Sequence, residues 1–260
     1  MKSCKPSELA VQMMEYLDCP CEVFGPMDDD DALWTAYQNA YEQGKTMGFV
    51  PVLVKVDDTL MECLLMNAAQ DDGADQLELR DIRNYRRGML EQAEEPGDRY
   101  LEHLIQERRQ EAEEDEIDWQ QEIMGVREQG EACERFLSYW NYQTKETDEM
   151  ILARIPAEHP WEIFAWLPMG NWNECPDTPE LMAVARYWFE THGAVPACVS
   201  HDELEFILEA PVGDYEAAGR LALEQYAFCP DRVEQCEEDG SVEKLADTLS
   251  RSTVWYFWWD

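Results

Sequence analysis

The chain has few basic residues. Only 20 Lys and Arg stand against 57 Asp and Glu among 260 residues, which gives a formal net charge of −37. Such a field repels the phosphates of nucleic acids and anionic membrane surfaces, so we expect neither as a partner. The simplest interpretation of this charge is a solvated acidic surface. The alternative is that the field, which attracts cations and basic proteins, draws in a basic protein partner.

Long apolar runs are also missing. No run approaches the roughly 20 residues that a membrane helix needs. Residues 1–10 are polar and lack the apolar core of a signal peptide. The nine Cys are an odd number and include no C-x-x-C pair, although Cys19 and Cys21 are separated by a single residue. These features predict a cytoplasmic protein with free thiols rather than a disulfide framework.

The sequence contains no phosphate-binding loop and no dinucleotide-binding fingerprint. Its four His include no pair three or four residues apart, which disfavours a metal site built on His. Cys198 lies three residues before His201, with Asp202 and Glu205 nearby, so a transition-metal site at this turn stays open as an alternative. We expect no bound metal and no cofactor.

Two similar segments organise the chain. Pro-x-Glu-(Val/Ile)-Phe occurs at residues 20–24 and 160–164, and Gly-x-Val-Pro occurs at residues 48–51 and 193–196. The repeated order predicts an internal repeat of two β-α-β-β units. The alternative is that the segments share Gly and Pro only because helix ends and strand starts favour them. The strands are expected at residues 22–24, 50–56 and 60–66, and again at 161–167, 195–199 and 204–208.

We therefore predict an α+β fold with a mixed or antiparallel sheet, flanking helices on one side and a helical insertion. Residues 1–66 form the first unit, residues 67–150 the charged helical insertion, and residues 151–260 the C-terminal domain. The run at residues 254–260 is apolar and aromatic, which predicts a last strand paired inside the sheet, because an exposed one would aggregate.

Several motifs of the C-terminal part resemble a bacterial family catalogued as domain of unknown function 4253. They lie at residues 160–168, 171–177, 201–205, 226–231 and 255–260. Residues 48–58 also look like the longer members of that family. The resemblance covers residues 151–260 well and residues 9–66 fairly. Because the family has no established activity, the resemblance implies membership of this family but no function.

Two Cys-Pro-Asp triplets supply the candidate nucleophiles, Cys175 and Cys229. Cys175 precedes a predicted helix start, where the helix dipole lowers the pKa of a thiol. His201 is then the candidate base, and Asp202 the acid that orients it. The residues favour a structural interpretation, in which Asp177 or Thr178 caps the following helix and Cys229 acts as a small buried apolar residue.

Carboxylates and one Trp are the candidate binding residues. Trp172 lies in a polar loop and is expected to be exposed, where its ring could stack on a ligand. The carboxylates could also furnish an acid/base pair for hydrolysis, although a chain with 57 acids places some near aromatic residues by chance. The binding candidates are Trp172, Glu162, Glu174, Asp177, Glu205 and Asp231.

The sequence thus favours a non-catalytic binding protein over an enzyme. One form would be an immunity-like protein that neutralises a basic protein through its acidic face. The alternative is a hydrolase that uses a cysteine or carboxylates of the C-terminal domain. The oligomeric state is not specified by any pattern in the chain.

Overall fold

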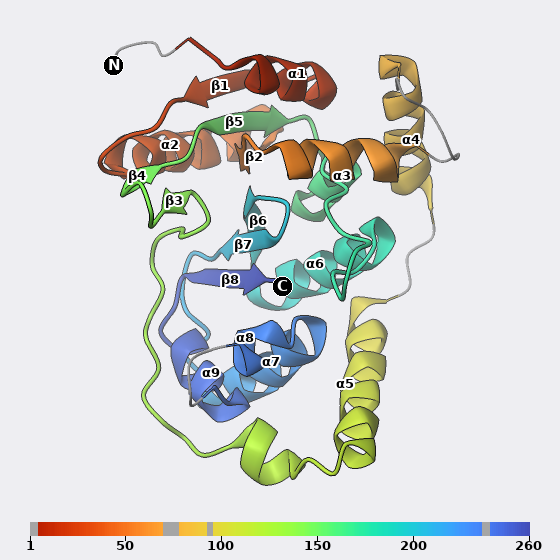
Figure 1. The fold of residues 1–260 in the computed structure, drawn as a ribbon, viewed down its shortest axis with the longest axis vertical. Helices are drawn as coiled ribbons and strands as arrows, with labels where there is room; N and C mark the ends of the chain where they lie inside the picture. The colour runs from red at the N-terminus through yellow and green to blue at the C-terminus, as the bar shows by residue number, and fades with distance from the viewer. Residues whose placement is uncertain (1–4, 70–77, 93–95, 236–239) are drawn as a thin grey trace.

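A computed structural model describes residues 5–69, 78–92, 96–235 and 240–260. Its centre is a mixed six-stranded sheet in the order β1-β5-β2-β6-β7-β8 (Figure 1). The α+β class and the mixed sheet are confirmed. The strands are β1 (Cys21–Phe24), β2 (Val50–Lys55), β5 (Met150–Ile155), β6 (Val195–Val199), β7 (Glu203–Ile207) and β8 (Val254–Trp258), beside a small ladder of β3 (Trp140–Asn141) and β4 (Glu146–Thr147).

Strands from both ends of the chain share this one sheet. β5 pairs antiparallel with both β1 and β2, and β7 pairs antiparallel with both β6 and β8. β2 and β6 meet in parallel, with Leu53 opposite Cys198 and Val54 opposite Val199. The carboxyl ends of β2 and β6 therefore lie at the same edge of the sheet, next to the amino ends of β5 and β7.

Helices cover both faces of the sheet, not one face as the sequence analysis expected. On one face, α2 packs Leu33 and Tyr37 against Leu53 of β2, together with Phe136 and Tyr139. The hydrophobic core on the other face is larger, and most of the remaining helices pack there. The helices are α1 (Glu8–Leu17), α2 (Asp31–Met47), α3 (Asp58–Ala68), α4 (Leu79–Glu91), α5 (Gly97–Glu114), α6 (Thr178–His192), α7 (Tyr215–Phe228), α8 (Asp231–Glu234) and α9 (Val242–Leu249), with short helices η1 (Trp119–Met124) and η2 (Pro160–Ala165).

Trp188 of α6 is the centre of the larger core. Its fully buried ring stacks on Phe257 at 5.4 Å between centroids and meets the edges of Trp255, Phe206 and Phe228 at 5.1–5.7 Å. Such pairs add stability beyond the area they bury. The aromatic C-terminal run is thus a true strand, but β8 forms an edge of the sheet rather than an inner strand.

Residues 60–66 form part of helix α3, so the predicted strand there is wrong. Asp57 caps the helix by accepting a hydrogen bond from the amide of Leu60 at 2.8 Å. Leu60, Leu64 and Ala68 recur every four residues and are buried on one side. The apolar run therefore follows a helical period, and the cap decides its conformation.

The strand predicted at residues 161–167 is also wrong, because this segment is the 3₁₀ helix η2. The Glu162 carboxylate accepts hydrogen bonds from the amides of Glu158 and His159 and holds the first turn. Pro160 at the start already has the φ angle that a helical turn needs. Glu22, its counterpart in the motif comparison, lies instead in strand β1.

The two β-α-β-β units are therefore not present as predicted, and only part of the proposed repeat has a structural counterpart. Gly48 ends α2 and Gly193 ends α6, each in a left-handed conformation with φ near +74° and +73°. Glycine adopts this conformation without the strain a Cβ would cause. Each glycine leads into a strand, and these two strands are the parallel neighbours β2 and β6.

Candidate functional site

A group of ionisable side chains, several of them partly exposed, lies where β2 and β6 end. The parallel pairing brings the turn after β2 beside the turn between β6 and β7. The segment before β5 arrives at the same edge, because β5 runs antiparallel to β2. We call the ionisable residues gathered there the strand-end cluster: Lys55, Asp57, Asp148, His201, Asp202 and Glu203.

His201 joins the two turns. Its Nδ1 lies 3.4 Å from Oδ2 of Asp57 and 3.3 Å from Oδ1 of Asp202. These are ion-pair distances, and neither contact has the geometry of a hydrogen bond. On its other side the imidazole stacks near the indole of Trp172, with 6.4 Å between ring centroids and 29° between planes. A protonated imidazole would here lie between two carboxylates and an aromatic ring.

Asp202 is fixed from three directions. Its Oδ1 accepts a hydrogen bond from the Ser200 hydroxyl at 2.8 Å, and its Oδ2 accepts one from Nε1 of Trp258 at 3.1 Å. Its main-chain carbonyl accepts the amide of Trp259 at 3.0 Å. The C-terminal strand thus holds this carboxylate in place, so it has little freedom to reorient.

Lys55 is the one lysine of the strand-end cluster and is paired with Asp148 at 2.9 Å. Burial opposes its charge, but the hydrogen bond and the charge of Asp148 outweigh burial and raise the pKa of Lys55. Burial raises the pKa of Glu203, although the hydroxyl of Tyr256 donates a hydrogen bond to it at 2.8 Å. Four carboxylates thus face one lysine and one histidine.

Glu205 lies two residues further along β7 and is fully buried. It accepts hydrogen bonds from the amide of Leu137 at 2.8 Å, and from the amide and hydroxyl of Ser138 at 3.2 and 2.7 Å. Burial nevertheless raises the pKa of Glu205 to about 7. This side chain fastens the segment before β3 to the sheet and has no surface for a ligand.

Residues 151–260 match the model of a domain of unknown function, DUF4253. The resemblance is confirmed for this region. The DUF4253 region supplies His201, Asp202 and Glu203, whereas Lys55, Asp57 and Asp148 come from outside it. No curated protein and no solved structure matches the chain.

The two candidate nucleophiles of the DUF4253 region are buried. Burial raises the pKa of the Cys175 thiol well above its usual range and that of Cys229 to about 12. Cys229 donates its thiol hydrogen bond to the carbonyl of Trp258 at 3.0 Å. Among the described residues, no hydrogen bond links His201 to either thiol. Both cysteines thus have the surroundings of protonated core residues.

The other candidate carboxylates of the DUF4253 region hold local structure. Asp177 caps α6 by accepting the amide of Glu180 at 3.1 Å. Glu174 pairs with Arg108 of α5 at 2.5 Å, and Asp231 accepts the amide of Asp260 at 3.0 Å. The structure therefore brings His201, Asp202 and Trp172 together. Within the described ranges, no hydrogen bond or ion pair joins His201 to the other candidates, which are Cys175, Cys229, Glu162, Glu174, Asp177, Glu205 and Asp231.

Sequence reasoning missed Lys55, Asp57 and Asp148. The available signal was an acidic turn directly after a β-branched strand at residues 50–56. This turn could not be assigned to a site, because the sequence does not show which strand pairs with residues 50–56. Once β2 is placed beside β6, the two acidic turns meet.

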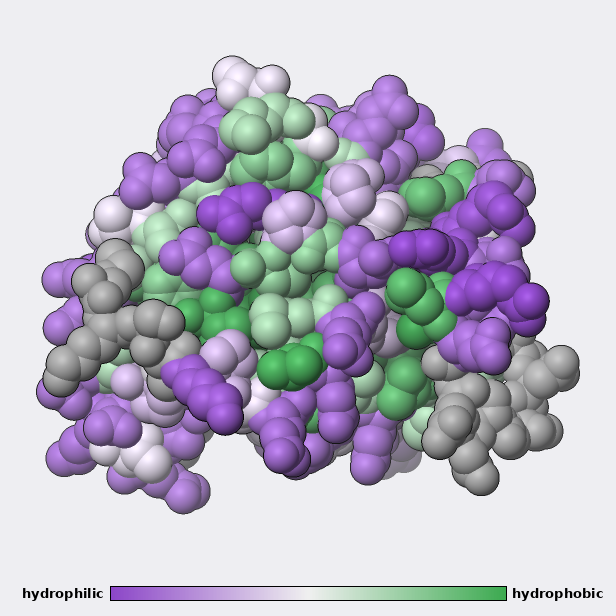
Figure 2. All heavy atoms as spheres, turned by 90° about the horizontal axis from the view of Figure 1, so that it is seen from above, coloured by the Kyte–Doolittle hydropathy of each residue, from purple (hydrophilic) through white to green (hydrophobic). Residues whose placement is uncertain are grey.

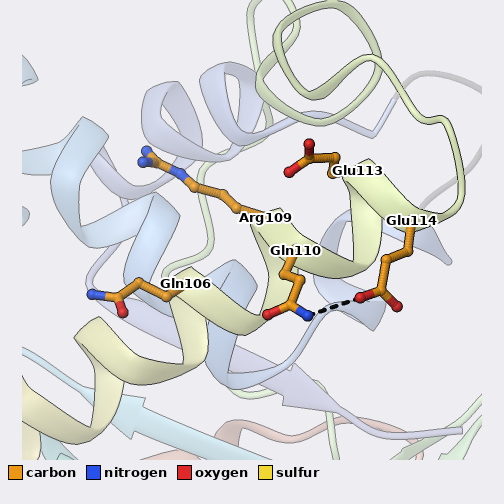
Figure 3. Close-up of a pocket in the computed structure, with 5 residues that line it drawn as sticks. All are labelled: Gln106, Arg109, Gln110, Glu113 and Glu114. Carbon is orange, nitrogen blue, oxygen red and sulfur yellow. Dashed lines mark hydrogen bonds between the residues drawn. The ribbon is translucent and has the colours of Figure 1, made fainter.

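A depression elsewhere in the molecule, on α5, is lined by Gln106, Arg109, Gln110, Glu113 and Glu114 (Figure 3). All five come from this single helix, and their side chains spread in different directions in the figure. Gln110 and Glu114 hydrogen-bond to one another at 2.8 Å. None of the candidate site residues lines the depression, and the side chains that line it do not point toward a common centre.

In the described part of the chain, no helix is long and apolar enough to cross a membrane. No group of three or more His, Cys, Asp or Glu in those ranges could hold a metal ion, and this includes the turn at His201.

Proposed function

We propose that the chain is a non-catalytic binding protein, and that its strand-end cluster receives a Lys or Arg side chain from a basic protein partner. The arrangement of Trp172, His201, Asp57 and Asp202 carries this proposal. The indole of Trp172, which is half-buried rather than exposed and stacks on His201, lies with two partly exposed carboxylates around the same imidazole.

This chemistry suits a cationic side chain. A guanidinium or ammonium group gains from an aromatic face within about 6 Å and from charge-assisted hydrogen bonds to carboxylates. The side chains of Asp57 and Asp202 are 20% and 24% exposed, so both remain open to a ligand. Their partial burial also makes a bound charge interact more strongly than it would in water.

The net charge of −37 supports the same class of partner. A strongly acidic surface speeds the approach of a basic protein and disfavours nucleic acids and anionic membranes. The strand-end cluster would then add a specific short-range contact to the long-range electrostatic attraction between the acidic chain and its basic partner.

The buried thiols argue against the hydrolase alternative. A nucleophilic cysteine needs an accessible thiolate and a base within hydrogen-bond reach. Cys175 and Cys229 are 4% and 0% exposed, and burial keeps both protonated. The carboxylates of Glu174, Asp177 and Asp231 are engaged in an ion pair, a helix cap and a contact with the chain end.

A native pull-down combined with zero-length cross-linking tests the proposal. Carbodiimide joins a partner Lys only to a carboxylate that it touches, so mass spectrometry should place cross-links at Asp57, Asp202 or Glu203. A Trp172→Leu bait should recover less of the partner, while a Glu102→Gln bait, changed on the exposed side of α5, should recover as much as the unaltered chain. Recovery of no basic partner, or cross-links confined to other faces, would refute the proposal.

A further inference from the structure

Cys19 and Cys21 form a pair of free thiols between α1 and β1, outside the strand-end cluster. Their sulfur atoms lie 3.9 Å apart, and both side chains are only partly buried. Pro20 separates them, and its carbonyl accepts the amide of Arg154 at 2.9 Å, which ties this segment to β5. The two sulfurs are therefore held side by side by the backbone.

Two arginines act on these sulfurs. Arg154 interacts electrostatically with Cys21, and Arg86 with Cys19. Both guanidinium groups favour negative charge on the sulfurs, and Arg154 also pairs with Glu22 at 3.5 Å.

Arg86 is the more unusual of the two. It is only 5% exposed, its guanidinium donates hydrogen bonds to the carbonyls of Tyr16 and Leu17, and its Nε has no partner. The neighbouring Asp18 pairs with Arg83. Within the described residues Arg86 has no carboxylate at ion-pair distance, but the charge of Asp18 acts on it from further away, and its guanidinium lies 5.3 Å from the ring centroids of both Tyr16 and Trp166.

The sulfur separation suits a shared ion better than a disulfide. Two thiolates on a metal with bonds of about 2.3 Å lie about 3.8 Å apart at the tetrahedral angle and about 4.6 Å apart in a linear arrangement. The observed 3.9 Å lies near the tetrahedral value, so a two-coordinate ion in a linear arrangement would need the sulfurs to move apart by about 0.7 Å. A disulfide would need the sulfurs to close to about 2.05 Å.

We propose that Cys19 and Cys21 bind one soft monovalent metal ion of the Cu(I) type through two thiolate sulfurs. Thiolates select soft ions. Because no group of three or more potential ligands occurs in the described ranges, an ion that accepts two ligands fits best. Binding releases the two thiol protons and changes no oxidation state.

Charge and access agree with this site. Two thiolates and one monovalent cation leave a charge of −1, which Arg86 and Arg154 surround. β1 is an edge strand, and the edge that it forms faces the viewer in Figure 2. Apolar side chains gather at the centre of this face and hydrophilic ones surround them, which is a suitable setting for a weakly hydrated ion.

Titration with Cu(I) against a chromophoric chelator, without oxygen, tests the site. The unaltered chain should bind one equivalent more at high affinity than the Cys19→Ser/Cys21→Ser variant. A Cys63→Ser/Cys133→Ser variant, which removes two other partly buried thiols, should retain that equivalent. X-ray absorption of the loaded chain should show two sulfur ligands and no nitrogen ligand.

Substitutions of Arg154 test whether its positive charge supports Cu(I) binding. Arg154→Gln should weaken Cu(I) binding about 10-fold because it removes a neighbouring positive charge, whereas Arg154→Lys should retain most of the affinity. Equal Cu(I) binding by the unaltered chain and the Cys19→Ser/Cys21→Ser variant would overturn the proposal. Nitrogen ligation in the loaded chain would overturn it as well.

Discussion

Nδ1 of His201 lies 3.4 Å from Oδ2 of Asp57, across the ends of two parallel strands. The two residues are 144 positions apart in the chain, and Asp57 comes from outside the DUF4253 region. The contact therefore depends on the shared sheet rather than on either segment alone. This relationship places the proposed binding surface at the junction of the N-terminal and C-terminal strands.

Asp177 is expected to act as a helix cap and not as a catalytic acid. Asp177→Ala should lower the free energy of unfolding by about 1 kcal/mol, because the amide of Glu180 loses its acceptor. Asp177→Ser should recover most of the loss, since Ser also caps helices. Urea denaturation measures both changes. A larger loss in the Ser variant than in the Ala variant would contradict a capping role.

Glu205 predicts a specific dependence of stability on pH. Burial raises its pKa from 4.5 to about 7 in the folded chain, so the folded state binds more protons than the unfolded state between these values. The stabilisation is complete below about pH 4.5 and is lost as the pH rises through 7. For this fully buried group the loss amounts to about 3 kcal/mol.

Glu205→Gln should remove this part of the pH dependence. Unfolding free energies of the variant should fall less between pH 5 and pH 8 than those of the unaltered chain. Both proteins retain Glu203 and Glu224, whose pKa values burial also raises, so the difference between the proteins isolates Glu205. Parallel curves for the two proteins would show that Glu205 does not titrate in this range.

The thiols should differ widely in reactivity. Cys175 and Cys229 are buried and their pKa values are raised, so alkylation at neutral pH should require unfolding. Cys21 is partly exposed and its pKa is lowered, so it should react first among the seven cysteines within the described ranges. Timed alkylation with peptide mass spectrometry ranks the sites. Rapid labelling of Cys175 or Cys229 in the folded chain would revive the nucleophile hypothesis.

Local signals in the sequence predicted much of the secondary structure. The helix cap expected after Cys175 is Asp177, which begins α6, and Gly193 of the repeated Gly-x-Val-Pro motif ends this helix. The two segments wrongly predicted to be strands, residues 60–66 and 161–167, are short apolar runs. Their helix-capping residues were not recognised in the sequence. Asp57 and Glu162 hold those helical turns through hydrogen bonds to main-chain amides.

The site could be predicted only in part, because strand order is a long-range property. His201, Asp202 and Trp172 stood out as unusual residues within one region of the sequence. Lys55 meets Asp148 only because β2 pairs with β5, which places Lys55 opposite Met150. No local pattern specifies that pairing. Lys55, Asp57 and Asp148, half of the strand-end cluster, therefore could not be predicted from the sequence.

A charge-matched comparison of affinities tests the central claim most directly. Asp57→Asn and Glu102→Gln each remove one negative charge, and Asn retains the ability to cap α3. Isothermal titration with the basic partner recovered by pull-down should show about 10-fold weaker binding for Asp57→Asn, as expected for a lost charged hydrogen bond. Glu102→Gln should bind as the unaltered chain does. Equal affinities for the two variants would mean that the partner responds only to overall charge, and the strand-end cluster would not be its binding site.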